Sequence, residues 1–274
     1  MAPANTPVMR AVEVGVVDAP AVVTFLVGWL KQQVEASKTE GVVFGLSGGI
    51  DSAVVGALCK QAVPERCQGL IMPCHSDPRD REDALAVARL FGIPVQTVDL
   101  SPVYDLHLAA LRQSLAAAEQ EQGPGLAVDR RASLAEANLK PRLRMATLYF
   151  FANSLNYLVV GTGNRSELTV GYFTKYGDGG VDLLPLGSLV KTQVRQLAEH
   201  LGLPRRVIDK PPSAGLWEGQ TDEGEMGTSY AELDRYILEG VAAGAVRAKV
   251  ERMSRAAAHK LTLPLIPELP EEFL

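Results

Sequence analysis

The sequence predicts an α/β protein built on a doubly wound, mostly parallel five-stranded sheet with helices on both faces. Short apolar segments typical of buried strands alternate along the chain with longer segments of helical periodicity. Four of the strands are expected at residues 41–46, 69–73, 94–98 and 157–161. A glycine-rich loop follows the first strand and leads into a helix, and sheets of this class bind ligands beyond the carboxyl ends of their strands.

The helices are expected between these strands, where start and stop signals frame them. Asp18 is a plausible N-cap for an amphipathic helix at 19–37. Asp77 and Pro78 suit the start of a helix that runs to Phe91, and Gly92 ends it. Further helices are expected at 50–63, 101–118, 138–156, 189–202, 229–240 and 242–259.

The remaining stretches lack a regular period and are expected to be irregular. Residues 1–17 look like a loose lead-in, 119–137 like a polar surface loop and 261–274 like a proline-punctuated tail. Residues 209–228 form a long polar stretch, and loops of this length in compact domains are usually either functional lids or disordered segments. Since no linker divides the chain, we expect residues 1–274 to form a single domain.

Composition narrows the function classes. A formal net charge of −5 argues against a nucleic-acid surface. The apolar run at 21–30 is too short to cross a bilayer, so no membrane association is expected. Cys59, Cys67 and Cys74 are odd in number and form no C-x-x-C pair, which fits a reducing, cytoplasmic setting. Cys74 beside His75 leaves a nucleophile possible, although a small residue at a strand end is the simpler interpretation.

The loop after the first strand carries the strongest chemical signal. Its residues are Gly45, Leu46, Ser47, Gly48, Gly49, Ile50, Asp51 and Ser52. A strand, a glycine turn and a helix N-terminus in this order bind anions, because backbone N–H groups converge there and the helix dipole adds positive charge. Asp51 would oppose an anion unless a cation is also bound, so it is a candidate Mg²⁺ ligand.

The pattern Ser-Gly-Gly-x-Asp-Ser at 47–52 resembles the pyrophosphate-binding loop of the ATP pyrophosphatases, a superfamily of adenylating enzymes with a Rossmann-like sheet. Further stretches resemble one of its families, the ammonia-dependent NAD synthetases. They are Asn138-x-x-x-Arg142-x-Arg144-Met145, Gly161-Thr162-x-x-x-x-Glu167, the block 171–186, Lys191, Pro212-Ser213-Ala214, Asp222-Glu223 and His259-Lys260. The resemblance runs in order from about residue 19 to 262, and the block 171–186 is its most specific part.

The resemblance implies roles for individual residues. It assigns 45–52, Thr162, Lys191 and Ser213 to ATP, and Asp51 and Glu167 to Mg²⁺. Asp51 and Lys191 are the implied catalytic residues, which act by orienting and stabilising charge. Deamido-NAD, the dinucleotide substrate, is assigned to Arg142, Lys175, Asp182, His259 and Lys260.

For four of these residues the sequence itself allows simpler interpretations. Glu167 also suits a solvated carboxylate in the first turn of a helix. Lys191 at a helix start runs against the dipole, so an anion nearby would explain it, but surface lysines are common. His259 and Lys260 also suit C-terminal helix capping. Residues 163–166 are Gly-Asn-Arg-Ser where some family members carry Asp-His-Ala-Ala, which puts side-chain contacts to the nucleotide there in question.

The implied reaction is ATP-dependent amidation of deamido-NAD to NAD through an adenylate, with AMP and pyrophosphate as by-products. Because no glutaminase domain precedes residue 19, free ammonia or ammonia from a separate protein is the expected nitrogen donor. The family resemblance also implies a homodimer in which His259 and Lys260 reach the neighbouring subunit. Two alternatives are another adenylating ligase, such as a GMP synthetase-like or tRNA-modifying enzyme, and a non-catalytic nucleotide-binding regulator.

Overall fold

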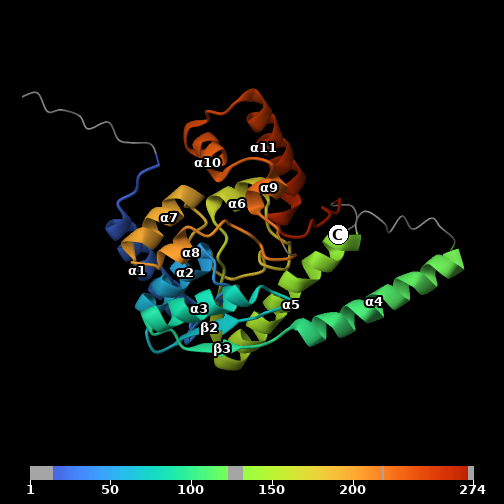
Figure 1. The fold of residues 1–274 in the computed structure, drawn as a ribbon, viewed down its shortest axis with the longest axis horizontal. Helices are drawn as coiled ribbons and strands as arrows, with labels where there is room; N and C mark the ends of the chain where they lie inside the picture. The colour runs from blue at the N-terminus through green and yellow to red at the C-terminus, as the bar shows by residue number, and fades with distance from the viewer. Residues whose placement is uncertain (1–14, 123–131, 218, 271–274) are drawn as a thin grey trace, which may run out of the picture.

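The computed structural model describes residues 15–122, 132–217 and 219–270, and they form a parallel sheet between two layers of helices (Figure 1). The strands are β1 (Gly41–Gly45), β2 (Cys67–Ile71), β3 (Val95–Thr97) and β4 (Tyr157–Val160). All pairings are parallel, in the order β3-β2-β1-β4. The chain therefore leaves β1 toward β2 on one side and returns beside it as β4 on the other, which creates a switch point between β1 and β4.

The predicted fold class is confirmed, but the predicted number of five strands is wrong for the described residues, whose sheet has four. A fifth position beside β4 is marked only by an isolated parallel bridge between Val160 and Leu183. The segment before Leu183 turns repeatedly, with Gly177 N–H bonded to Thr174 O and Gly180 N–H bonded to Gly177 O. These turns use backbone groups that a continuous strand would need for pairing.

The helices follow in chain order. They are α1 (Ala19–Ser37), α2 (Ile50–Ala62), α3 (Pro78–Phe91), α4 (Ser101–Gln122), α5 (Ala132–Leu155), α6 (Arg165–Val170), α7 (Lys191–His200), α8 (Arg205–Ile208), α9 (Asp222–Met226), α10 (Tyr230–Glu239), α11 (Gly244–Ala257) and a 3₁₀ turn (Ala258–Lys260). The predicted caps are confirmed: Asp18 Oδ1 accepts from Ala21 N–H, and Asp77 Oδ1 accepts from Arg79 N–H.

Two irregular predictions need correction. Residues 119–137 were expected to be a loop, yet α4 continues to Gln122 and α5 already begins at Ala132, because both flanks are rich in alanine, leucine and glutamate, which favour helices. Residues 209–228 contain the short helix α9, which Thr221 caps at its start and Gly227 ends. Residues 1–14 of the predicted lead-in, 123–131 of the 119–137 stretch and 271–274 of the predicted tail lie outside the described residues.

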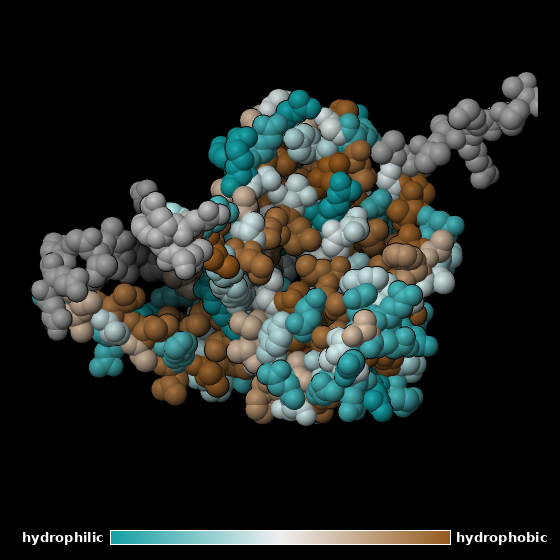
Figure 2. Space-filling model, turned by 180° about the vertical axis from the view of Figure 1, so that it is seen from behind, coloured by the Kyte–Doolittle hydropathy of each residue, from teal (hydrophilic) through white to brown (hydrophobic). Residues whose placement is uncertain are grey.

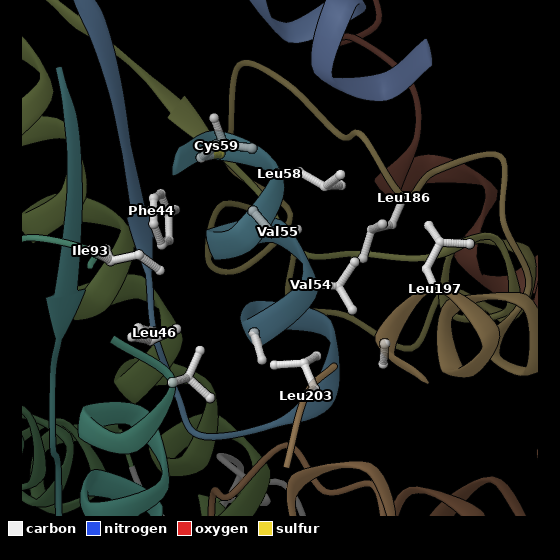
Figure 3. Packing of buried hydrophobic residues seen from close by; sticks show 14 of the residues in the cluster. Phe44, Leu46, Val54, Val55, Leu58, Cys59, Ile93, Leu186, Leu197 and Leu203 are labelled. Carbon is white, nitrogen blue, oxygen red and sulfur yellow. The ribbon is translucent and has the colours of Figure 1, made fainter. Parts of the chain in front are cut away.

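Side chains on alternate positions of β1 pack against the two helical layers. Val42 and Phe44 join a core with α1, α2, α3, α7 and α8, part of which is drawn in Figure 3. Val43 faces the opposite layer, formed by α4 and α5. A third cluster joins α6, α9, α10 and α11 beyond the carboxyl ends of the strands (Figure 1). This third cluster lies beside the β1–β4 switch point, where α6 follows β4.

Among the described residues, no helix is long and apolar enough to cross a membrane.

Candidate functional site

The loop after β1 has the geometry of an anion-binding turn. β1 ends at Gly45 and α2 begins at Ile50, with Gly49 as an N-cap that offers no side chain to the first N–H groups of the helix. Ser47 Oγ lies 3.0 Å from Ser52 Oγ, and Ser52 Oγ donates to Gly49 O at 2.9 Å. These bonds fix the turn while the amide groups of the α2 N-terminus remain free of a side-chain cap, as an anion site requires.

Gly48 is the position in this loop at which only glycine fits. Its φ is 82°, which favours glycine, and a Cβ placed there would lie 2.2 Å from the backbone oxygen of Asp80 in α3. The loop therefore rests directly on the first turn of α3.

The chain after β4 forms the other wall of the switch point. Asn164 caps α6 by accepting from Glu167 N–H, while Glu167 Oε2 accepts from Asn164 N–H at 3.2 Å. The amide Nδ2 of Asn164 donates to Asp51 Oδ1 at 3.1 Å. Since Asn164 is fully buried, this single side chain joins the carboxylate of α2 to the capped end of α6.

Lys191 lies between the two carboxylates. Its ammonium group donates to Asp51 Oδ2 and lies 3.5 Å from Glu167 Oε1. A lysine at the first position of α7 suggested an anion nearby. Asp51 and Glu167 are themselves anionic groups that contact Lys191. The alternative, that Lys191 is an ordinary exposed lysine on the surface, is wrong because Lys191 is buried.

Two further residues complete this site. Tyr230 of α10 donates its hydroxyl to Asp222 Oδ2 at 2.9 Å and lies 3.4 Å from Glu167 Oε1. Its ring lies 5.0 Å from the Lys191 ammonium, a cation–π contact. Asp222 of α9 is buried, and its Oδ1 has no hydrogen-bond partner among the described residues.

The site contains more acidic than basic side chains, and their burial and charges shift their pKa values. Burial raises the pKa of Glu167; the Lys191 charge lowers it, and the Asp51 charge raises it further. Burial also raises the pKa of Asp222. Burial works against the charged form of Lys191, but Asp51 and Glu167 outweigh it, so the pKa of Lys191 is raised. Two carboxyl groups contact one ammonium group, and the nearby Asp222 adds a third acidic group that acts on it through its charge, so an additional cation would relieve the site.

A second buried carboxylate holds the elements in place. Asp234 of α10 accepts from the Ser166 hydroxyl and, at 2.8 Å, from Thr192 N–H. Ser166 Oγ in turn accepts from Lys191 N–H at 3.0 Å. Asp234 therefore satisfies the N-terminal groups of α7 and fixes the backbone from which Lys191 projects.

The predicted metal ligands Asp51 and Glu167 do converge, since one ammonium group contacts both. No group of three or more histidine, cysteine or acidic side chains with metal-binding geometry occurs in the described parts of the chain. Two carboxylates with an orphaned carboxylate oxygen nearby still fit Mg²⁺, which prefers oxygen and usually takes its remaining ligands from water and substrate phosphates. The alternative of a freely solvated Glu167 is wrong, because its side chain is only 16% exposed.

The other residues predicted to contact ATP are less engaged. Thr162 is half-buried in the segment that follows β4. Ser213 is exposed, and its hydroxyl accepts from Gly215 N–H at 3.1 Å. Their contacts with ATP remain predictions.

The residues predicted to hold the dinucleotide fall into one group and an outlier. The Lys175 amine donates to His259 O, and Arg142 Nη2 lies 3.4 Å from Lys175 O. Lys260 donates to Gly171 O at 2.7 Å and Phe173 O at 2.8 Å of its own chain. This brings 142, 175, 259 and 260 around the block 171–175.

Asp182 is the outlier. Its Oδ1 accepts from the Tyr149 hydroxyl at 2.9 Å, and its Oδ2 accepts from Val159 N–H at 2.8 Å. Both carboxylate oxygens thus bind β4 and α5, so Asp182 has a clear part in holding the edge of the sheet. A contact with the dinucleotide remains a prediction.

The cysteines are all buried and unpaired. Burial raises the pKa of Cys74 and outweighs Arg144 and Lys140, whose charges lower it. A raised pKa disfavours the thiolate, so the interpretation of Cys74 as a buried strand-end residue fits the structure better than a nucleophile.

Sequence reasoning missed Asn164, Tyr230 and Asp234 as parts of the site. Asn164-x-x-Glu167 is a capping-box pattern and was detectable from the sequence. Tyr230 and Asp234 carried no such signal, because both lie on α10 and reach the site only through the packing of α6, α7 and α10.

Comparisons with known proteins show the family to which the chain belongs. The model of the family described as NAD synthase matches residues 22–264. The NH(3)-dependent NAD(+) synthetase of Carboxydothermus hydrogenoformans is 48% identical over 89% of this chain and 96% of its own, and that of Archaeoglobus fulgidus is 46% identical over 89% and 94%. Among solved structures, an NMN synthetase from Francisella tularensis has a TM-score of 0.83 at 36% identity, covering 93% of this chain and 100% of its own. An NH3-dependent NAD synthetase from Campylobacter jejuni has a TM-score of 0.71 at 29% identity, covering 92% and 100%. The chain belongs to the NAD synthase family.

Proposed function

We propose that this chain catalyses the ATP-dependent amidation of deamido-NAD with ammonia, giving NAD, AMP and pyrophosphate. The observation that carries the proposal is the junction of an anion-binding loop with two carboxylates, Asp51 and Glu167, at the β1–β4 switch point. Relatives named NH(3)-dependent NAD(+) synthetase, at up to 48% identity over most of both chains, support the assignment.

Adenylation comes first. The nicotinate carboxylate attacks the α-phosphate of ATP, the bond to the β-phosphate breaks, and pyrophosphate leaves into loop 45–52. The free N–H groups at the α2 N-terminus stabilise the leaving group. Lys191 lies at the same end of the sheet and supplies a fixed positive charge near the phosphates.

Amidation follows. Ammonia attacks the carbonyl carbon of the adenylate, the bond to the AMP oxygen breaks, and one proton leaves the nitrogen. A free carboxylate would have to expel oxide, so adenylation supplies the better leaving group. No covalent side-chain nucleophile is needed, which is consistent with the buried Cys74. We propose that residues 209–228 act as a lid that keeps water from the adenylate; the bond from Lys140 Nζ to Leu216 O at 2.7 Å holds this segment against α5.

Asp51 and Glu167 would hold Mg²⁺. The ion, when bound, supplies charge neutralisation of the ATP phosphates. In the structure Lys191 shares both carboxylates, so these residues are prepared for a cation at this point.

We further propose a homodimer. Figure 2 shows apolar side chains gathered on α4, where the helix projects from the body of the protein, and Val103, Leu106, Leu111 and Leu115 are exposed there. The segment after Lys260 also exposes Leu263, Leu265 and Ile266. Exposed apolar surface of this extent favours association, and sedimentation velocity tests it directly. We also propose a cytoplasmic setting, which the free cysteines fit. The proposed nitrogen donor is free ammonia or ammonia supplied by a separate protein.

The test is incubation with Mg-ATP, ammonium and deamido-NAD, with NAD measured through alcohol dehydrogenase and AMP and pyrophosphate measured in parallel. Asp51→Asn should abolish pyrophosphate exchange into ATP. Glu40→Gln is the matched control, because Glu40 lies at the opposite end of β1 in an exposed ion pair with Arg66. Formation of ADP, or no turnover by the wild-type protein, would overturn the proposal.

A second candidate is amidation of the mononucleotide, favoured by the similarity to the NMN synthetase from Francisella tularensis. It is separated from the first by the ratio of kcat/KM for deamido-NAD and for nicotinic acid mononucleotide.

A further inference from the structure

Lys210, just after α8, is bound to two carboxylates of another element. Its ammonium group donates to Asp80 Oδ1 at 2.6 Å and to Asp83 Oδ2 at 3.0 Å, both on α3. Arg206 contacts the other oxygen of Asp83 at 2.9 Å. None of these residues belongs to the site described above, yet the cluster lies beside it.

Asp80 connects this cluster to the phosphate-binding loop. Its side chain accepts from Lys210, and its backbone oxygen lies against Gly48, where a Cβ would approach it to 2.2 Å. The same residue therefore contacts loop 45–52 through its backbone and residue 210 through its carboxylate.

The segment after Lys210 continues toward the carboxylate cluster. Asp222 N–H donates to Pro212 O at 3.0 Å, and Asp222 accepts from Tyr230. Residues 209–213, which include the predicted ATP contact Ser213, are thus held by α3 at one end and by α9 at the other.

The contact of Lys210 with Asp80 and Asp83 is more than a solvent-exposed surface ion pair. The side chain of Asp83 is only 13% exposed, and both its oxygens are bound. Asp80 and Asp83 lie three residues apart on one helix face, where like charges repel without a shared cation. Burial works against the Lys210 charge, but its bonds to Asp80 and Asp83 raise its pKa, so it stays protonated.

We propose that Lys210 is a positioning residue for the ATP site: through Asp80 and Asp83 it sets residues 209–213 against loop 45–52. This inference rests on the proposed function in that the nucleotide is taken to be ATP. Loss of the Lys210 contact removes the side-chain bonds that tie residues 209–213 to α3, while the bond from Asp222 N–H to Pro212 O still holds the segment to α9.

The experiment measures binding of a non-hydrolysable ATP analogue with Mg²⁺ by titration calorimetry in wild type, Lys210→Met, Lys210→Arg and the control Arg206→Gln. Lys210→Met should weaken binding about tenfold, equivalent to ~1.4 kcal/mol. Lys210→Arg should recover most of the affinity, because arginine reaches both carboxylates. Arg206→Gln leaves the Lys210–Asp80 bond intact and should bind within about twofold of wild type. In turnover, Lys210→Met should raise the KM for ATP, with the KM for deamido-NAD unchanged.

Wild-type affinity in Lys210→Met overturns the inference, and so does equal weakening in Lys210→Met and Arg206→Gln. An unfolding midpoint of Lys210→Met close to that of Arg206→Gln excludes general destabilisation as the cause. If the wild-type protein binds the analogue but does not amidate deamido-NAD, the proposed function fails while the binding series still decides the role of Lys210. If the wild type does not bind the analogue, both fail.

Discussion

Replacing Asn164 separates two contributions that one side chain makes to the site. The carbonyl oxygen of Asn164 caps α6, and its amide group donates to Asp51 at 3.1 Å. Asn164→Ala removes both. Asn164→Ser keeps an oxygen for the cap but is too short to bridge to Asp51, so the two variants resolve the contributions.

The expected losses follow from these two bonds. Loss of an N-cap costs about 1 kcal/mol, and loss of a hydrogen bond to a charged group costs about 1.5–3 kcal/mol when the groups are buried. Asn164 is fully buried, so no solvent replaces its contacts. Asn164→Ala should therefore destabilise the protein by about 2.5–4 kcal/mol and Asn164→Ser by about 1.5–3 kcal/mol. For a chain of this size the alanine variant corresponds to a fall in Tm of roughly 5–15 °C.

Urea denaturation followed by far-UV circular dichroism measures both losses, with Ser154→Ala as the control, since Ser154 is exposed and bonds only its own helix. The same variants should lower the rate of pyrophosphate exchange, because Asp51 loses its only amide partner among the described residues. A loss below about 0.5 kcal/mol in Asn164→Ala, the range of ordinary surface substitutions, would refute the reasoning.

Three further predictions concern the same site. Gly48→Ala should lower the free energy of unfolding by about 2 kcal/mol or more, and Gly92→Ala by about 1 kcal/mol. Both glycines have positive φ, but only Gly48 faces a backbone oxygen. Similar losses for the two variants in urea denaturation would contradict this reasoning. Without metal, the free energy of unfolding should fall as pH rises from about 4.3, the ordinary glutamate pKa, through the raised pKa of Glu167, since the folded state retains a proton that the unfolded chain releases. Glu167→Gln should flatten this dependence, and equal slopes for the two proteins would show that Glu167 does not cause it. Mg²⁺ at about 100 times its Kd should stabilise the wild type by about 2.7 kcal/mol and Asp51→Asn by much less. Thermal unfolding with and without EDTA measures both stabilisations, and equal values would exclude Asp51 as a ligand.

Local signals in the sequence were sufficient to place the helices with strong caps. Asp18, Asp77 and Gly92 act within a few residues: α1 begins after Asp18, and α3 begins after Asp77 and ends before Gly92, as predicted. The stretch 119–137 was harder, because Gly-Pro-Gly at 123–125 suggested a long loop while the flanking alanine-rich residues continued both helices.

The site was predictable only in part. Asp51 and the glycine loop are read from one contiguous motif, and Glu167 follows from its resemblance to a known pattern. The contacts of Lys191 with both carboxylates, and those of Tyr230 with Glu167 and Asp222, depend on how α6, α7 and α10 pack. Side-chain packing between distant segments leaves no periodic or motif signal in a single sequence, so the support of the site became visible only in the fold.

The pairing of β1 with β4 also has a kinetic consequence. It joins Gly41 to Tyr157, and the bonds of Asp51 to Asn164 and Lys191 span 113 and 140 residues of sequence. Such long-range contacts require closure of large loops and form late in folding, whereas α1 and α3 depend on local signals. A refolding chain should therefore regain most of its helical signal before it regains nucleotide binding, so the ability to bind ATP reports the last step of folding.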